Sequence, residues 1–173
     1  MANYEKTVLY IFPEIDKIVA RVDEKFKEKV FSSKRDNSPA LEQCNELIKL
    51  TEVKSALLII KAIVGDWVKR LTDEERAMVE YKYFGKKSNL AVVDIHKRQY
   101  YRKQSKLASS LLFFLEKKGV TSEWFDKKLL HLSFIKEVSR RVDLREKTFE
   151  KARVQLISTG NGIAKTNHGY SVS

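Results

Sequence analysis

The chain has 173 residues, which allows one compact domain or two small ones and excludes a large multidomain enzyme. Its 34 Lys and Arg outnumber its 23 Asp and Glu, and the resulting net charge of +11 favours a polyanionic partner such as nucleic acid, or less often an anionic membrane surface. A 43% apolar content is sufficient for a core, and 6 Gly with 2 Pro leave few turns for a β fold. We therefore expect a mainly α protein.

The first seventy residues contain two long apolar periodicities. The first runs from Tyr4 to Phe31, and Pro13 either separates a short initial helix from a longer one or starts the longer one. The second follows Ser38 and Pro39, an N-cap and a proline at the first helical position, and continues to about Leu71. We expect residues 1–70 to form a helical self-association or interaction region, whose apolar faces are buried within one chain or between chains.

The single cysteine and the hydropathy pattern indicate in which cellular compartment the protein is found. Cys44 cannot form an intrachain disulfide, and its place on an apolar helix face predicts a small core residue. Residues 1–6 lack a signal-peptide pattern, and no apolar run approaches the roughly 18 residues of a membrane span. We expect a cytoplasmic protein without membrane contact.

The middle of the chain predicts several helices in close succession. Residues Thr72–Glu75 form a capping box, and the helix that follows ends at Gly85. A short apolar helix is expected over Asn89–Asp94, and a longer one begins after His96 and ends near Gly119. We expect residues 71–118 to form a domain of their own.

This domain also concentrates the positive charge. Between residues 85 and 118 there are nine Lys and Arg against two carboxylates, a net +7 out of the total of +11. Arg98, Arg102 and Lys106 are spaced by four residues, which places them on one helix face suited to phosphates. A solvated basic face without a partner is the alternative.

A capped helix, a short helix, a tight turn and a basic helix are the layout of a helix-turn-helix. The stretch Leu71–Leu115 resembles region 4 of bacterial sigma factors, and more closely the ArpU/RinA-type regulators of phage late genes. The resemblance rests on Leu71–Arg76, on Tyr81–Phe84 and on Tyr100–Arg102. The short helix is about one turn shorter than in the family, and the usual turn glycine is absent.

The resemblance implies that the basic helix enters the major groove of DNA. Its N-terminal residues Lys97, Arg98, Gln99 and Arg102 then meet bases or flanking phosphates, and Tyr101 donates to a phosphate. Lys103 and Lys106 contact the DNA backbone, while Tyr100 packs beneath the helix. The basic residues Lys86 and Lys87 complete the expected DNA-binding set.

The C-terminal region, residues 121–173, contains a second candidate motif after a helix capped by Thr121 and extending to Leu132. Helices over Phe134–Val142 and Arg145–Ile157, with a turn at Asp143–Leu144, resemble another helix-turn-helix. The glycine-rich tail after Ser158 would then form the β-hairpin of a winged helix. The alternative is a helical bundle followed by a tail. The candidate DNA-binding residues of this motif are Arg145, Lys147, Thr148, Lys151 and Arg153.

Motifs of other chemistries are missing from the sequence. The three histidines are dispersed without ligand spacing, and no nucleotide-binding, serine-hydrolase or zinc-protease motif occurs, so we expect no metal, no cofactor and no catalysis. We expect instead a sequence-specific DNA-binding transcriptional regulator, an activator of phage or prophage late genes, with double-stranded DNA, RNA polymerase and a second copy as its partners. The alternatives are a small-terminase-like DNA-packaging subunit and a helical module that binds RNA polymerase without touching DNA.

Overall fold

The computed structural model describes residues 3–32, 39–86 and 97–160, and the side chains of residues 97–98, 149–150 and 152–160 are not described. Within these ranges the chain is mainly helical and contains no strand. The helices are α1 (Tyr4–Ile11), the 3-10 turn η1 (Phe12–Glu14), α2 (Ile15–Ser32), α3 (Ala40–Lys69), α4 (Asp73–Tyr83), α5 (Lys97–Lys117), α6 (Ser122–Leu129) and α7 (Ser133–Gly160).

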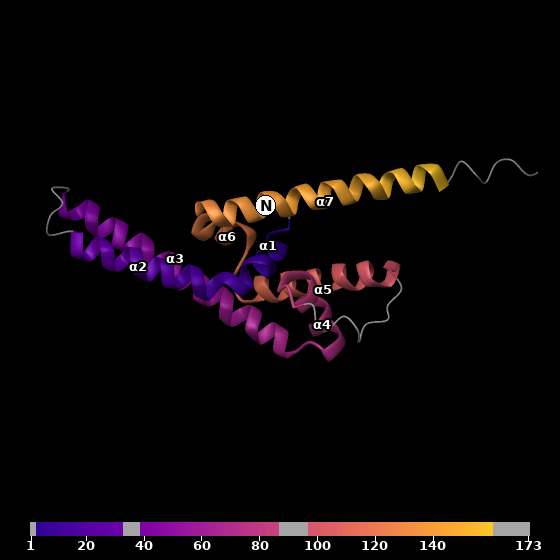
Figure 1. The fold of residues 1–173 in the computed structure, drawn as a ribbon, viewed down its shortest axis with the longest axis horizontal. Coiled ribbons are helices and arrows are strands. Elements are labelled where there is room, and N and C mark those ends of the chain that lie inside the picture. The colour runs from indigo at the N-terminus through magenta and orange to yellow at the C-terminus, as the bar shows by residue number, and fades with distance from the viewer. Residues whose placement is uncertain (1–2, 33–38, 87–96, 161–173) are drawn as a thin grey trace, which may run out of the picture.

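An arm built from α2 and the first half of α3 extends to one end of the molecule (Figure 1). Pro13 lies in η1, where the chain bends between α1 and α2, because proline cannot donate the backbone bond that a continuous helix needs. Ion pairs from Lys54 to Asp23 and from Lys61 to Asp16 join the two helices of the arm. The expected break at Pro13 is therefore present, with α1 as a separate helix.

The core forms where α1, α3, α5 and α6 meet. It includes Val8, Leu57, Ile60, Leu111 and Phe125, all fully buried. The hydroxyl of Tyr4 donates a 2.8 Å hydrogen bond to the carbonyl of Val120, which closes the core at the turn after α5. That turn contains Gly119 at φ 81°, a left-handed conformation that glycine adopts without strain.

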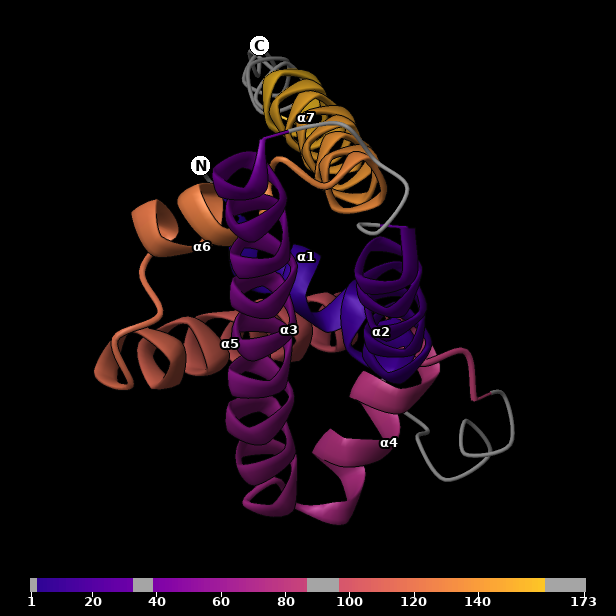
Figure 2. The ribbon, with the colours of Figure 1, turned by 90° about the vertical axis from the view of Figure 1, so that its left-hand side faces the viewer.

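Helix α7 packs its first half on α1 and then continues away from the rest of the protein (Figures 1 and 2). Ile135, Ser139 and Val142 are buried at a spacing of three and four residues, which is the pattern of one unbroken helical face. Lys6 pairs with Glu146 at 2.6 Å, and the Arg145 guanidinium lies 5.7 Å from the centre of the Tyr10 ring. These contacts fix α7 against α1.

The continuity of α7 corrects the prediction of two C-terminal helices. Asp143 and Leu144 lie inside α7, because neither residue interrupts the helical periodicity and no glycine or proline is present there. The second helix-turn-helix is therefore wrong. The expected β-hairpin is not supported either, because Ser158–Gly160 are helical, and the rest of the tail, residues 161–173, lies outside the described residues.

Smaller corrections concern helix ends and one side chain. Pro39, rather than Ser38, is the N-cap of α3, with an extended ψ of 137°, and Ser38 lies outside the described residues. Helix α6 ends at Leu129, three residues before the expected end. Cys44 is exposed, because it lies on the face of α3 that is turned away from α2 and the core.

The capping box of α4 is confirmed. The backbone N–H of Glu75 donates to the Thr72 hydroxyl, and the Glu75 carboxylate accepts from the Thr72 backbone. No helix in the described part of the chain is sufficiently long and apolar to cross a membrane.

Candidate nucleic-acid interface

The candidate interface lies on α5, whose orientation is fixed by polar contacts to α3 and α4. The side-chain amide of Gln104 is buried and donates to the carbonyl of Met78 on α4 at 3.1 Å. On α3, the indole N–H of Trp67 donates to the Ser110 hydroxyl at 3.2 Å. Beneath these bonds Leu107, Leu111 and Leu115 are buried, so α5 can present only its opposite face.

That opposite face begins with polar and cationic side chains. Gln99, Arg102 and Lys106 are exposed, and their spacing of three and four residues places them on one side of the helix. Neither Arg102 nor Lys106 forms an ion pair with any carboxylate among the described residues. Two cations thus face solvent one turn apart on a rigid helix, an arrangement that suits two neighbouring phosphates.

The other predicted DNA-binding residues around this face differ in whether their side chains already have partners within the chain. The Lys103 ammonium lies 2.6 Å from the Glu74 carboxylate of α4, so it would have to exchange this partner to contact a phosphate. Tyr101 is exposed and lies edge-on to Tyr100 at 5.7 Å. Tyr100 packs against the core, as expected, and burial raises the pKa of its hydroxyl. Lys86 is exposed and pairs with Glu80 at 3.0 Å.

Part of the predicted motif falls where the structure gives no detail. The short helix expected over Asn89–Asp94, the cap at His96 and the basic residue Lys87 lie outside the described residues. Lys97 and Arg98 begin α5, but their side chains are not described. Of the predicted helix-turn-helix, the structure therefore describes only α4, α5 and the contacts between them.

The second predicted set lies along α7 and forms no site of its own. Arg145 contacts the Tyr10 ring and hydroxyl, and the Thr148 hydroxyl donates to the Leu144 carbonyl of its own helix. Lys147 and Lys151 are exposed, four residues apart. Arg153 is in the helix without a described side chain. With the predicted turn absent, Lys147 and Lys151 lie on the surface of one continuous helix and do not belong to a recognition helix of a second motif.

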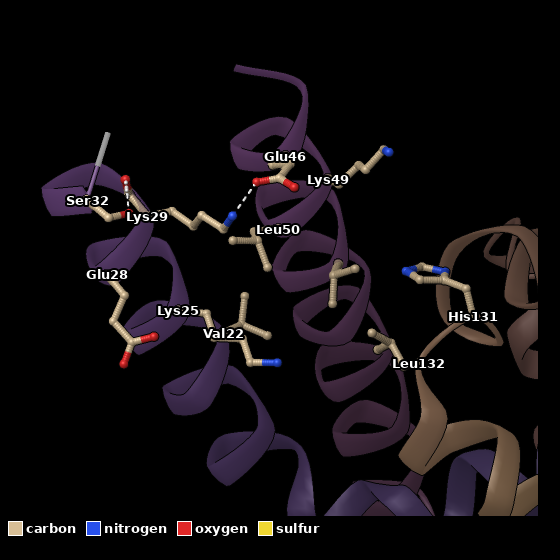
Figure 3. Close-up of a pocket in the computed structure, with 11 residues that line it drawn as sticks. Val22, Lys25, Glu28, Lys29, Ser32, Glu46, Lys49, Leu50, His131 and Leu132 are labelled. Atoms are coloured by element: carbon tan, nitrogen blue, oxygen red, sulfur yellow. Dashed lines mark hydrogen bonds and ion pairs between the residues drawn. The ribbon is translucent and has the colours of Figure 1, made fainter. Parts of the chain in front are cut away.

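A hollow that the sequence does not predict lies between the arm and the corner from α6 to α7 (Figure 3). Its volume is about 680 Å³, and Val22, Leu50 and Leu132 contribute apolar side chains to its wall. Lys29 from α2 bridges to Glu46 on α3 at 2.6 Å, and His131 faces α3 from the other side. Because these residues come from three separate segments, no local sequence signal could have revealed the hollow.

Among the described residues no cluster of three or more His, Cys, Asp or Glu could hold a metal ion. No family model, no curated protein and no solved structure matches the chain.

Proposed function

We propose that the protein is a DNA-binding protein that contacts double-stranded DNA through the exposed face of α5. The observation that carries this proposal is the exposed row Gln99, Arg102 and Lys106 on a helix whose other face is anchored to α3 and α4. An anchored helix lowers the entropy lost on binding, and its cations supply the contacts that dominate affinity for DNA. The net charge of +11 supports the same partner.

The roles of the residues follow from their positions on α5. Arg102 has the planar guanidinium that makes a bidentate contact with guanine, whereas Lys106 lies one turn further along, where a groove-bound helix approaches the DNA backbone. Gln99 supplies an amide one turn before Arg102 that can pair with adenine. Lys103, held by Glu74, fixes α5 on α4 in the first instance and contacts phosphate only if this ion pair opens.

The biological role that we propose is transcription regulation of the phage late-gene type. It is supported by the resemblance of Leu71–Leu115 to sigma-like and ArpU/RinA-type regulators, and by the confirmed capping box at Thr72 that belongs to the resembling stretch.

The first prediction distinguishes base reading from general attraction, on duplexes covering the genome segment that encodes the protein and on a scrambled duplex. Arg102→Ala should weaken binding to the preferred duplex by about 1–3 kcal/mol and affect the scrambled one little. Lys106→Ala should weaken binding to both about equally. Fluorescence anisotropy at one salt concentration measures these differences.

The matched control is Lys127→Ala, which removes one exposed lysine from α6 and should leave both affinities unchanged. If Lys127→Ala weakens binding as much as Lys106→Ala does, the interface is not on α5. If the wild-type protein binds none of the duplexes, the proposed function is wrong.

A further inference from the structure

Helix α3 has a second apolar face, which is exposed. Its 30 residues bury Val53, Leu57, Ile60, Val64 and others against the rest of the protein. On the opposite side a row of uncharged residues is spaced alternately by three and four: Leu41, Cys44, Ile48, Thr51, Ser55, Leu58 and Ala62, followed by Gly65. The first seven are exposed and Gly65 is half-buried. We call this row the α3 stripe; in Figure 2, α3 stands in front, between α2 and α6.

The spacing of the α3 stripe is the heptad repeat of a helix that packs against another helix. It continues over about three and a half heptads, a length of about 36 Å at 1.5 Å per residue. A helix that only covers a core needs one apolar face, and a helix with apolar residues on both sides is normally buried on both. Leu41 is 74% exposed and Ile48 55% exposed, so the α3 stripe is uncovered in the single chain.

Several polar groups in or beside the α3 stripe already have partners within the chain. The Thr51 hydroxyl donates to the Leu47 carbonyl of its own helix, which leaves its methyl group to face outward. Two charged side chains beside the stripe form ion pairs with other helices: Lys54 pairs with Asp23 of α2, and Glu52 pairs with Lys128 of α6. The stripe therefore presents few groups that would lose hydration when another apolar surface covers it.

Gly65 provides an independent indication of what covers the stripe. A glycine inside a helix destabilises it relative to alanine. Outside the neighbouring backbone of α3, no atom of the described residues lies within 4 Å of the position that a Cβ of Gly65 would occupy, so packing among these residues does not require this glycine. A glycine at one end of the stripe and the large Leu41 at the other are complementary in size if two stripes meet head to tail.

We infer that a second copy of this chain packs on the α3 stripe, with the two α3 helices antiparallel. In this arrangement Leu41 of each copy lies opposite Gly65 of the other, Cys44 opposite Ala62, and Ile48 opposite Leu58. A parallel pair would instead oppose equal residues and leave a gap at the glycines. It would also bring the two bodies, each part of a chain with a net charge of +11, to the same end. Association is independent of DNA binding and is tested without DNA.

Sedimentation velocity across a concentration series tests the interface. The wild-type protein should form a dimer of about twice 20.2 kDa. Ile48→Glu and Leu58→Glu should each shift the dimer to monomer, because each buries two charges, related by the two-fold axis, in an apolar seam. The matched control, Phe113→Glu, changes an exposed apolar residue of α5 and should leave the dimer intact. A monomeric wild type, or a dimer that is insensitive to both stripe variants, overturns the inference.

Gly65→Leu distinguishes a dimer interface with size-matched side chains from nonspecific apolar association. Since the space around Gly65 is open within one chain, this substitution should leave the thermal stability of the monomer unchanged or higher while it weakens dimerisation at least tenfold. If the added apolar side chain strengthens association instead, the size-matched arrangement is wrong.

Disulfide trapping tests the orientation, because Cys44 is the single cysteine of the chain. Under mild oxidation Ala62→Cys should yield a covalent dimer, since residues 44 and 62 of the two copies face each other. The double variant Cys44→Ser, Ala62→Cys should yield none. Efficient crosslinking of the wild-type protein through Cys44 alone would demonstrate a parallel pair and overturn the antiparallel arrangement.

Discussion

Two buried tyrosines illustrate how much an individual contact determines in this fold. Tyr4 donates its hydroxyl to the Val120 carbonyl at 2.8 Å. Tyr83 is buried and lies edge-on to Tyr10 of α1, with 4.9 Å between the ring centres, and its hydroxyl has no hydrogen-bond partner among the described residues. The same chemical group is thus satisfied at one site and unsatisfied at the other.

This difference predicts opposite responses to the same substitution. Tyr4→Phe should lower the free energy of unfolding by about 1–3 kcal/mol, because it leaves a buried carbonyl unpaired. Tyr83→Phe should leave the stability unchanged or raise it, because it removes a buried polar atom that has no partner. Urea unfolding curves measure both, and equal losses in the two variants would contradict the assigned hydrogen bonding.

The Tyr4 hydroxyl also makes the free energy of unfolding depend on pH in the alkaline range. Burial, with smaller contributions from Glu116 and Glu5, raises the pKa of Tyr4 from 10.0 to about 12. Because the folded-state pKa is the higher one, the stabilisation is complete below about pH 10, where the unfolded tyrosine is still protonated, and is lost as the pH rises towards 12. The decrease in unfolding free energy between these pH values should therefore be smaller in Tyr4→Phe, and an equal decrease would show that other groups cause it.

At the scale of single elements, local signals predicted three helix boundaries correctly. The capping box at Thr72, the break at Pro13 and the stop at Gly119 all depend on the residues of one turn, and all three are present. The prediction failed at Asp143–Leu144, because these two residues interrupt neither the helical periodicity nor the backbone hydrogen bonds of α7. It also failed at Cys44, since an apolar helix face does not reveal whether the chain itself covers it.

Helix α7 offers a direct test of this correction. Leu144 is half exposed in the middle of the helix, so Leu144→Pro should interrupt the backbone bonds at a point with little side-chain packing. The far-ultraviolet circular dichroism should show a loss of helix relative to Leu144→Ala, with a destabilisation of the helix of about 3 kcal/mol. Unchanged helix content would instead favour a turn at this position.

The candidate site shows the same division between local and tertiary information. Periodicity placed Arg102 and Lys106 on one face of a helix, and both are exposed on it. The ion pair of Lys103 with Glu74, by contrast, depends on the packing of two helices that the sequence pattern does not orient. The hollow near His131 requires three segments distant in the sequence and has no local signature.

For the whole molecule, the proposed function and the inferred dimer together restrict the form of the DNA site. Two antiparallel α3 helices are related by a two-fold axis, so two copies of α5 would meet DNA symmetrically. Footprints of the wild-type protein should then show two half-sites in inverted repeat, and Ile48→Glu should protect one half-site with reduced affinity. Equal protection by wild type and variant would separate DNA binding from dimerisation.

The central claim is that Arg102 and Lys106 on α5 neutralise DNA phosphates or contact bases beside them. The salt dependence of affinity tests it most directly, because each neutralised phosphate contributes roughly −0.9 to the slope of log affinity against log salt. The double variant Arg102→Ala, Lys106→Ala should have a slope shallower than the wild type by at least about 0.9, the contribution of the phosphate that Lys106 contacts, while Lys127→Ala keeps the wild-type slope. A flat wild-type response, or equal slopes in the wild type and the double variant, would contradict the claim.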